Sequence, residues 1–532
     1  MTRDSFSLAV RNIASQGDTD VFPFPVENRV FHDMPDDVVD VLQDKIHRHF
    51  ATWIQTRAPV NESTLAMVGY TGFRWVTQID PLWNAYLLGL VLEMAPSIET
   101  HRVPREKEVA FSYRFEPDPE TGRLFAEDGY ASFRDRSREL AEQHPYVVTA
   151  DIADFYSRVY HHSVENALMR LRLGNDLHSR VMDILKSFSS GVSYGVPVGG
   201  PAARILTELV LTSTDKLLLS DGMVFCRYAD DYHIFAATHE DAYGQLISLS
   251  DKLFRNEGLP LQKSKSRVMT SAEFLHTAAL VGQDGEDDEG HPETREFLRL
   301  SLRYDQYSAT AAEDYDLLKT QVSQFDIVGM LAREVAKSRV HTALTRRLVR
   351  AVNFVDESLQ GAAVETLVKN LDVLAPVLPS VLRALAELTP RLEQSVRESV
   401  RTELIDRVRA GSHIMKVDLN RAYAVRVLAQ EYSEEAEQLL TQIFEAASPD
   451  FIKRDVVVAM ANWSAEHWLR DKKTRYAHLG SWVKRAFIIS SYRLGDEGQH
   501  WRRAVRGQWD EFDMLVAEWA AARVPQGLGL DL

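Results

Sequence analysis

The chain is 532 residues long, and its 45% share of hydrophobic residues can build at least two sizeable cores, so two or three domains are expected. Its formal net charge of −16 argues against a general, charge-driven affinity for nucleic acid but leaves local basic surfaces open. The single cysteine, Cys226, excludes an intramolecular disulfide and a cysteine-rich zinc site.

The same features indicate where the protein works. The N-terminus lacks an apolar core of signal-peptide length, and no segment approaches the roughly 18 uninterrupted apolar residues of a membrane span. We therefore expect a cytoplasmic protein without membrane contact, in which Cys226 fills a core position.

Residues 1–144 mix helices with one strand-like segment. Apolar periodicity predicts helices over 35–54 and 81–95. The run 108–118 predicts a strand that ends in turn residues.

Residues 145–281 alternate strands with helices. The apolar run 146–152 predicts a buried strand, and 222–238 predicts a strand, a tight turn and a second strand. Helices are predicted over 161–173, 175–188, 200–218 and 241–258. An alternating α/β core follows from this order.

The remainder of the chain is predicted to be helical, with proline and glycine between the helices. Five of the six residues 284–289 are acidic, so 282–345 is expected to be an acidic linker followed by helices. Residues 346–532 are expected to form an all-α domain. Stacked, HEAT-like helical repeats would give this pattern, and a plain helical bundle fits nearly as well.

Three acids lie at the ends of predicted strands. Asp151 follows an apolar strand, and Asp230 and Asp231 occupy the turn of the hairpin 222–238. Two-metal phosphoryl transfer needs hard carboxylate ligands for two divalent ions about 4 Å apart. An Asp-Asp pair alone is usually turn chemistry, but three acids at two chain-distant strand edges fit a two-metal site.

The motifs around these acids resemble, in their order, those of the reverse-transcriptase family over residues 145–275. The segments similar to the four palm motifs of that family are DIADFY at 151–156, GVPVGGP at 195–201, RYADD at 227–231 and GLPLQKSKS at 258–266. The resemblance implies a right-hand polymerase with fingers in 1–144, a palm in 145–281 and a thumb-like region in 282–345, followed by the helical-repeat domain.

The resemblance also implies the metal site. Two Mg²⁺ ions, for which Mn²⁺ can substitute, would be held by Asp151, Ile152, Asp230 and Asp231. Lys265 would stand near the triphosphate as a proton donor to pyrophosphate. Lys263 competes for that role, and a solvated surface lysine is the alternative for either one.

The incoming deoxynucleoside triphosphate (dNTP) would contact residues from three of these regions. Tyr156 would be the gate that clashes with a 2′-hydroxyl, and a half-buried core aromatic is the alternative. Arg114 would pair with the triphosphate, unless it is a strand arginine that faces solvent. The other residues expected at the nucleotide are Asp154, Phe155, Pro197, Val198 and Gly199.

One position departs from the common family pattern. Val198 stands where most reverse transcriptases have glutamine, which puts ordinary templated synthesis in question. Together with 154–162, 201–211 and 111–114, this position resembles the bacterial abortive-infection and defence-associated reverse transcriptases. That group implies DNA synthesis from dNTPs in antiphage defence.

The template remains open at this stage. A separate RNA or non-coding RNA could serve as template, with DNA as the product. The first alternative is a template-independent or protein-primed DNA polymerase. The second is a non-catalytic nucleic-acid scaffold, and a homo-oligomer is compatible with all three.

Six of the nine tryptophans fall after residue 460, among closely spaced arginines and lysines. Alternating aromatic and basic side chains can hold single strands, so Arg475, Arg485, Arg502 and Arg503 are predicted to bind nucleic acid. Tryptophans that anchor helices in a core, with charges outside, are the alternative, and a protein assembly surface is a third possibility.

Overall fold

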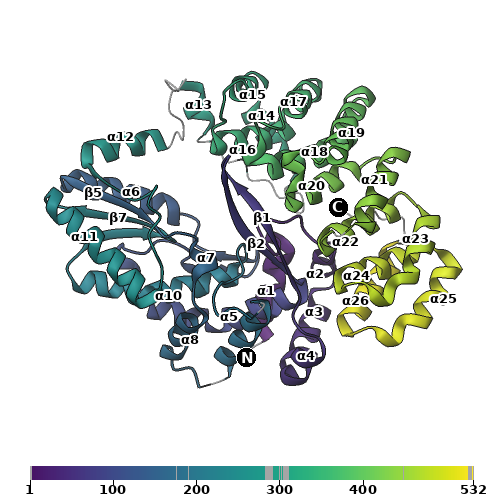
Figure 1. The fold of residues 1–532 in the computed structure, drawn as a ribbon, viewed down its shortest axis with the longest axis horizontal. Coiled ribbons are helices and arrows are strands. Elements are labelled where there is room, and N and C mark those ends of the chain that lie inside the picture. Colours follow the sequence, from purple (N-terminus) through teal and green to yellow (C-terminus); the bar gives the residue numbers. More distant parts are fainter. Residues whose placement is uncertain are drawn as a thin grey trace. The chain divides into compact units, whose positions relative to one another are not determined.

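The computed structural model describes residues 3–174, 176–189, 191–281, 292–298, 311–446 and 448–524, together with residues 300, 302 and 530. The acidic segment 284–289, predicted as a linker, lies outside the described residues. The chain divides into two compact units (Figure 1). The first comprises Met1–Ser63, Trp75–Ala279 and Arg506–Trp519, and the second comprises Thr64–Arg74, Leu280–Val505 and Ala520–Leu532.

A four-stranded sheet lies at the centre of the first unit. Its order is β6 (Val224–Tyr228), β7 (Asp231–Ala236), β5 (Tyr146–Asp151) and β8 (Arg267–Thr270), and every neighbouring pair is antiparallel. The predicted strands over 146–152 and 222–238 are confirmed. Strand β8 was not predicted, because it is only four residues long and its alternation is interrupted by Arg267.

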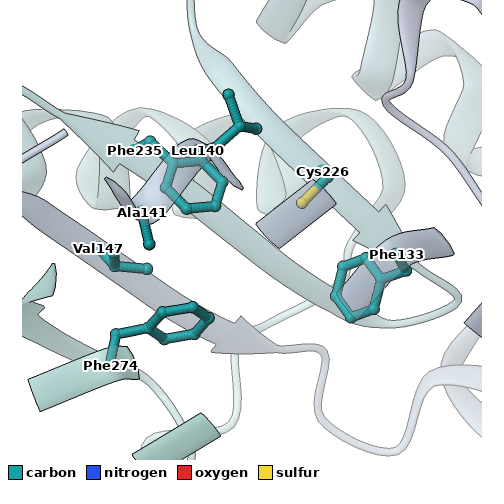
Figure 2. Packing of buried hydrophobic residues seen from close by; sticks show 7 residues of the cluster. All are labelled: Phe133, Leu140, Ala141, Val147, Cys226, Phe235 and Phe274. Atoms are coloured by element: carbon teal, nitrogen blue, oxygen red, sulfur yellow. The ribbon is translucent and has the colours of Figure 1, made fainter. Parts of the chain in front are cut away.

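Both faces of this sheet are covered. Val147, Cys226 and Phe235 point to one face, where they pack against Phe133 of α6 (Gly129–Gln143) and Phe274 of α12 (Ser271–Val281), as Figure 2 shows. Helices α10 (Pro201–Ser220) and α11 (His239–Lys252) cover the other face. Cys226 is fully buried, which confirms its predicted core position.

Helix α5 (Pro81–His101) is the apolar centre of the rest of this unit. Because it is hydrophobic on every side, it is buried along most of its length, and α1 (Arg3–Gln16) and α10 pack on it. The remaining helices of eight or more residues here are α8 His161–Arg170, α9 Leu177–Phe188 and α26 Glu511–Arg523. The shorter ones are α2 Glu27–Asp33, α3 Pro35–Asp40, η1 Val41–His47, α4 Phe50–Thr56, α7 Phe155–Arg158 and η3 Leu253–Glu257.

Two predicted elements differ from the structure. The helix expected over 35–54 is divided into α3, a π-helical turn and α4. The strand expected over 108–118 is reduced to β3 (Phe115–Asp118), which pairs with β4 (Arg123–Phe125). Before β3, Ala110 forms a parallel bridge with Arg227 of β6. Ser112 and Tyr113 then form a turn, and the guanidinium of Arg102 donates to their carbonyls.

In the described residues of the second unit, the regular secondary structure is helical, apart from its part of the β1–β2 sheet (Asn61–Val68 and Gly72–Ile79). One row of successively contacting helices consists of α16 Thr342–Ala351, α18 Leu378–Leu388, α20 Asp418–Leu428, α22 Asp450–Asn462 and α24 Ser481–Ser490. A second row consists of α15 Ile327–Val335, α17 Glu357–Lys369, α19 Gln394–Arg409 and α21 Glu434–Glu445. The remaining helices are α13 Pro292–Phe297, α14 Ala311–Val322, α23 Glu466–Lys472 and α25 Gly495–Val505.

The helical nature of the C-terminal region is therefore confirmed, whereas its HEAT-like character stays a prediction. Among the helices that the structure describes, none combines the length and the apolar character that crossing a bilayer requires.

Candidate active site

Two of the predicted acids face each other across neighbouring strands. The antiparallel register of β5 and β7 places Asp151 directly opposite Asp231. One residue further, the amide of Ile152 donates to the carbonyl of Asp230 over 3.1 Å, which extends the pairing into the turn. The fold thus brings Asp151 to the adjacent pair Asp230 and Asp231 at one end of the sheet, although the two motifs are distant in the sequence.

A buried arginine supports the turn that carries Asp230. Arg227 is fully buried on β6, and its guanidinium donates to Glu208 at 3.0 Å and to Asp215 at 2.6 Å, both on α10. It also donates to the carbonyl of Ala229, over 2.9 Å. Ala229 has φ +52°, which is unfavourable for a residue with a side chain, so this contact stabilises a strained turn.

Burial and neighbouring carboxylates raise the pKa values of Asp230 and Asp231. Burial and then the charge of Asp151 raise the pKa of Asp230 to about 6. Asp231 reaches solvent, yet partial desolvation and the charges of Asp230 and Asp151 raise its pKa to about 7. Such crowding is costly without a counter-charge, so the site favours a bound cation.

Lys265 supplies one positive charge to this site. Its Nζ donates to Oδ2 of Asp151 over 2.8 Å, while most of its side chain remains in solvent. Burial lowers the pKa of Lys265, but the hydrogen bond with Asp151 and the charges of all three aspartates outweigh it, so that the pKa is raised. The amide of Gln262 holds the same segment by donating to the carbonyl of Asp151 at 2.7 Å. No such contact joins Lys263 to the carboxylates within the part of the chain that the structure describes.

Tyr156 lies beside the carboxylates, in contact with a residue that the sequence did not single out. Its pKa is raised by burial first and then by the neighbouring Tyr113, with a smaller contribution from Asp230. Its ring is partly exposed and packs on Phe155 at 5.2 Å between centroids. The ring is therefore held in place by its neighbours and still reaches solvent. A gate for the sugar would require both properties.

Backbone strain is concentrated around these residues. Tyr113, Asp154 and Ala229 have φ of +48°, +50° and +52°, and together they are half of the six non-glycine residues with positive φ in the described chain. Such conformations cost about 1–3 kcal/mol each and occur mostly where function requires them.

The turn 197–199 rests on an N-terminal segment that carries no recognisable motif. Gly199 has φ +116°, and a Cβ there would lie 2.4 Å from Oγ1 of Thr19, so this close approach requires glycine. Val196 and Pro197 precede it, and the amide of Val196 donates to the carbonyl of Tyr156 over 2.9 Å. The second and first motifs are thereby joined through their backbones.

Arg204 is a second residue that sequence reasoning missed. It is paired with Asp20 at 2.7 Å, and its guanidinium lies 5.2 Å from the centroid of the Tyr113 ring. Its position in the first turn of α10, directly after the turn 197–199, was the available signal. It provides a partly exposed cation next to the Tyr113 and Tyr156 pair.

Arg114 is placed differently from the expected triphosphate contact. It is 5% exposed, and its guanidinium donates to Glu99 at 2.9 Å and to the carbonyls of Ala110 and Val103. With all three nitrogens used inside the protein, it stabilises the turn that presents Tyr113. The neighbouring Tyr113, rather than Arg114, approaches Tyr156.

The four C-terminal arginines do not form one free basic surface. Arg485 is buried, and Arg475 pairs with Glu445 at 2.6 Å. Arg502 donates to the carbonyl of Ser491 and lies over the Tyr492 ring, which leaves only Arg503 both exposed and without a described partner. The tryptophans Trp468, Trp482, Trp509 and Trp519 are buried, as expected for core anchors.

The donor set fits magnesium. Carboxylate oxygens are the ligands that Mg²⁺ prefers, and Asp151, Asp230 and Asp231 offer them at one end of the sheet, where Lys265 compensates only part of their charge. The side chain of Ile152 is buried, so it could contribute only its main-chain carbonyl. As they stand, no three metal-binding side chains of the described residues are close enough to hold an ion, so binding requires small side-chain shifts, including release of Asp151 by Lys265.

Comparison with known proteins agrees with this geometry. Residues 97–307 match the family model described as reverse transcriptase (RNA-dependent DNA polymerase). The chain contains a reverse-transcriptase domain. This domain includes the four-stranded sheet, the three aspartates and Lys265, and it supports nucleotide polymerisation as the activity of the chain. No curated protein matches the chain significantly.

Solved structures with similarity to the chain include three telomerases. That of Candida albicans, in complex with a TWJ fragment of telomeric RNA, is 10% identical over 69% of each chain, with a TM-score of 0.31. That of Candida tropicalis, in apo form, is 10% identical over 76% of this chain and 73% of its own, with a TM-score of 0.30. The third, from Candida tropicalis with the same kind of RNA fragment, has 11% identity and a TM-score of 0.29, over 71% and 67% of the two chains. Scores this low do not establish a common arrangement of the whole chain.

Proposed function

We propose that the reverse-transcriptase domain synthesises DNA from dNTPs by two-metal nucleotidyl transfer. The observation that carries the proposal is the pairing of Asp151 with Asp231 across β5 and β7, with Asp230 at the adjoining turn. Mg²⁺ bound there would activate the attacking 3′-hydroxyl and neutralise the triphosphate. Asp151, Asp230 and Asp231 would hold the ions, together with the carbonyl of Ile152.

The residues around the carboxylates suggest how the nucleotide is held. Lys265 would leave Asp151 when the metal binds and donate a proton to the departing pyrophosphate, because its ammonium already lies at the site. The ring of Tyr156 would lie beneath the sugar and exclude a 2′-hydroxyl. Arg204, held between Asp20 and Tyr113, is suited to contact phosphate oxygens. Asp154, Phe155, Pro197, Val198 and Gly199 would form the surrounding wall.

We further propose a role in antiphage defence, in a bacterial cytoplasm, which rests on the resemblance of 111–114, 154–162 and 195–211 to defence-associated reverse transcriptases. Template-independent or protein-primed synthesis remains the second candidate, and Val198 favours it. A valine at this turn cannot donate or accept the hydrogen bonds that a glutamine side chain would offer to a template or nucleotide.

The purified chain, Mg²⁺ and labelled dNTPs test these proposals together. Incorporation into a product whose sequence copies a supplied or copurifying RNA would support templated synthesis. Homopolymeric DNA, made without added nucleic acid or attached to the protein, would support the second candidate. Absence of incorporation with every primer, template and divalent metal would contradict both and favour a non-catalytic scaffold.

A further inference from the structure

One segment of the second unit is positively charged, although the chain as a whole is negative. Between Glu334 and Asp356 there is no acid, whereas the same stretch contains Lys337, Arg339, His341, Arg346, Arg347 and Arg350. The chain as a whole has a net charge of −16, so such a stretch is unusual here. It covers α16 and the loop before it.

The tip of the β1–β2 sheet, which belongs to the same unit, is fixed against this segment. The hydroxyl of Tyr70 accepts from the amide of Val340 at 2.8 Å and donates to the carbonyl of Val373 at 2.7 Å. The guanidinium of Arg339 lies 5.9 Å from the centroid of the Tyr70 ring. The tip of the hairpin adds Arg74 to the basic residues of this segment. It adds no acidic residue, because 63–79 contains no aspartate or glutamate.

These arginines have positive neighbours and no described counter-charge. Burial, followed by the charge of Arg74, lowers the pKa of Arg346, and burial followed by Arg350 lowers that of Arg347. Arg347 donates to the carbonyl of Leu300, a neutral acceptor. Across the described part of the chain, no carboxylate forms an ion pair with Arg74, Arg346 or Arg350.

Several other arginines of this unit are placed in the opposite way. Arg407 pairs with Asp372 and Glu403, Arg470 with Glu466 and Glu497, and Arg475 with Glu445. Like charges held together at a surface are unfavourable unless an anion binds. The arrangement at α16 is therefore that of an anion-binding surface, in contrast to the solvated ion pairs further along the chain.

The kind of anion is inferred from the spread of the arginines and from an exposed aromatic residue next to Arg74 in the sequence. Phe73 is 51% exposed at the tip of the same hairpin, where a base can stack on its ring. Several separated cations with an exposed aromatic match a strand with regularly spaced phosphates and unpaired bases. A single phosphate or a lipid headgroup would not need this spread.

We propose that Arg74, Arg339, Arg346, Arg347 and Arg350 form a binding surface for single-stranded nucleic acid, on which Phe73 stacks a base. This arginine surface replaces 468–509 as the place where the C-terminal region holds a strand. The surface is independent of catalysis, because no member belongs to the carboxylate site, and it would exist even if the proposed polymerase activity failed.

The test is binding of a labelled oligothymidylate and a labelled oligouridylate to the full chain, without dNTPs and with divalent ions chelated. Anisotropy is measured from low to moderate salt for the unaltered chain and for R74Q/R346Q/R350Q. Each phosphate contact on a single strand contributes about 0.7 to the slope of log affinity against log salt, so the slope should flatten by about 2. Affinity at low salt should fall at least about tenfold.

The matched control is R407Q/R470Q/R475Q, which removes the same charge from ion-paired positions of the same unit. Its slope and affinity should stay close to those of the unaltered chain. Phe73→Ala should weaken binding by about tenfold without changing the slope, because it removes stacking and no charge.

Three results would overturn the inference. The first is an unchanged slope in R74Q/R346Q/R350Q while its melting temperature matches that of the unaltered chain. The second is an equal loss of affinity in the control, which would mean that total charge alone governs binding. The third is unaltered oligonucleotide binding together with a changed mass in solution, which would make the arginine surface a protein interface.

Discussion

The interaction between the neighbouring side chains of Tyr156 and Tyr113 links a residue of the first motif to a strained turn earlier in the chain. Tyr156 is thereby held next to Asp230, where a sugar must lie if the carboxylates bind the triphosphate. The ring of Tyr156 would form the steric gate. Its hydroxyl, which interacts with Tyr113, would help to fix the position of the ring. The two parts can be separated by substitution.

Replacing Tyr156 by Ala should raise ribonucleotide incorporation relative to deoxyribonucleotide incorporation by about tenfold or more, because space for the 2′-hydroxyl opens. Tyr156→Phe is the matched control, since it removes only the hydroxyl and should keep most of the discrimination. Competition between the two nucleotides in single-turnover assays measures the ratio. Equal ratios in all three proteins would assign Tyr156 to the core.

Glu257 gives a prediction for stability against pH. It is 7% exposed, and burial raises its pKa to about 7. In the unfolded chain its pKa is near the ordinary value of about 4.3, so the folded state holds the proton more tightly. The contribution of Glu257 to the free energy of unfolding is therefore fully present at low pH, and it is lost as pH rises from about 4.5 to about 7.

Glu257→Gln keeps the shape of the side chain without a charge. The melting temperature of this variant should exceed that of the unaltered chain at pH 8, by an amount equivalent to about 1–3 kcal/mol, and the two should converge near pH 5. Melting curves at both pH values provide the measurement. A difference that is constant from pH 5 to pH 8 would mean that the carboxyl does not titrate in this range.

At the scale of elements, the β6–β7 hairpin depends on α10 beneath it. Arg227, Glu208 and Asp215 are all buried, and Arg102 adds a further contact to Glu208 at 2.6 Å. Removing one member of such a set leaves a buried charge without its partner. The network therefore couples the position of the YADD turn to the packing of this helix.

Arg227→Met should lower the free energy of unfolding by about 3–5 kcal/mol and displace the turn, with loss of nucleotide incorporation. Arg255→Met serves as control, because Arg255 pairs with Asp251 at the surface of the same unit and should contribute less than about 1 kcal/mol. Denaturant unfolding of both variants measures the difference. Equal, small effects would show that the network does not stabilise the turn.

The elements that the sequence predicted well are those with strong local patterns. The run 146–152 is apolar because its sheet is covered on both faces, and α10 begins at Pro201 as a first-turn proline should. The strand expected over 108–118 is interrupted at Ser112 and Tyr113, where Arg102 takes up carbonyls of the chain, and its apolar residues do not reveal this contact. Side-chain bonds of this kind over ten residues or more leave no periodic signal.

Within the site, the same distinction separates what was predicted from what was missed. Asp151, Asp230 and Asp231 could be proposed because they lie in motifs whose order is readable along the chain. Tyr113 and Arg204 contribute through contacts with Tyr156 and Asp20 that arise only in the folded state. Arg114 was proposed because a guanidinium suits phosphate, yet in the folded chain it is buried and paired with Glu99.

At the scale of the whole molecule, the two units carry different charges for different tasks. The first gathers carboxylates at one end of its sheet, which suits cations, and the second gathers arginines without described ion pairs at α16, which would suit a phosphate chain. The net charge of −16 therefore says little about binding, because the local arrangement decides it. Whether the chain acts as a homo-oligomer stays a prediction that its mass in solution would test.

The central claim is that Asp230 belongs to the site of nucleotide transfer. Asp230→Asn keeps the size of the side chain and removes the charge that would offset a divalent ion. Asp183→Asn, on an exposed position of α9, is the matched control. The measurement is Mg²⁺-dependent incorporation of labelled dNTPs by the unaltered chain and both variants, each with its melting temperature. We predict a loss of at least about a hundredfold for Asp230→Asn alone, with folding retained. Undiminished incorporation in a folded Asp230→Asn protein would contradict the assignment.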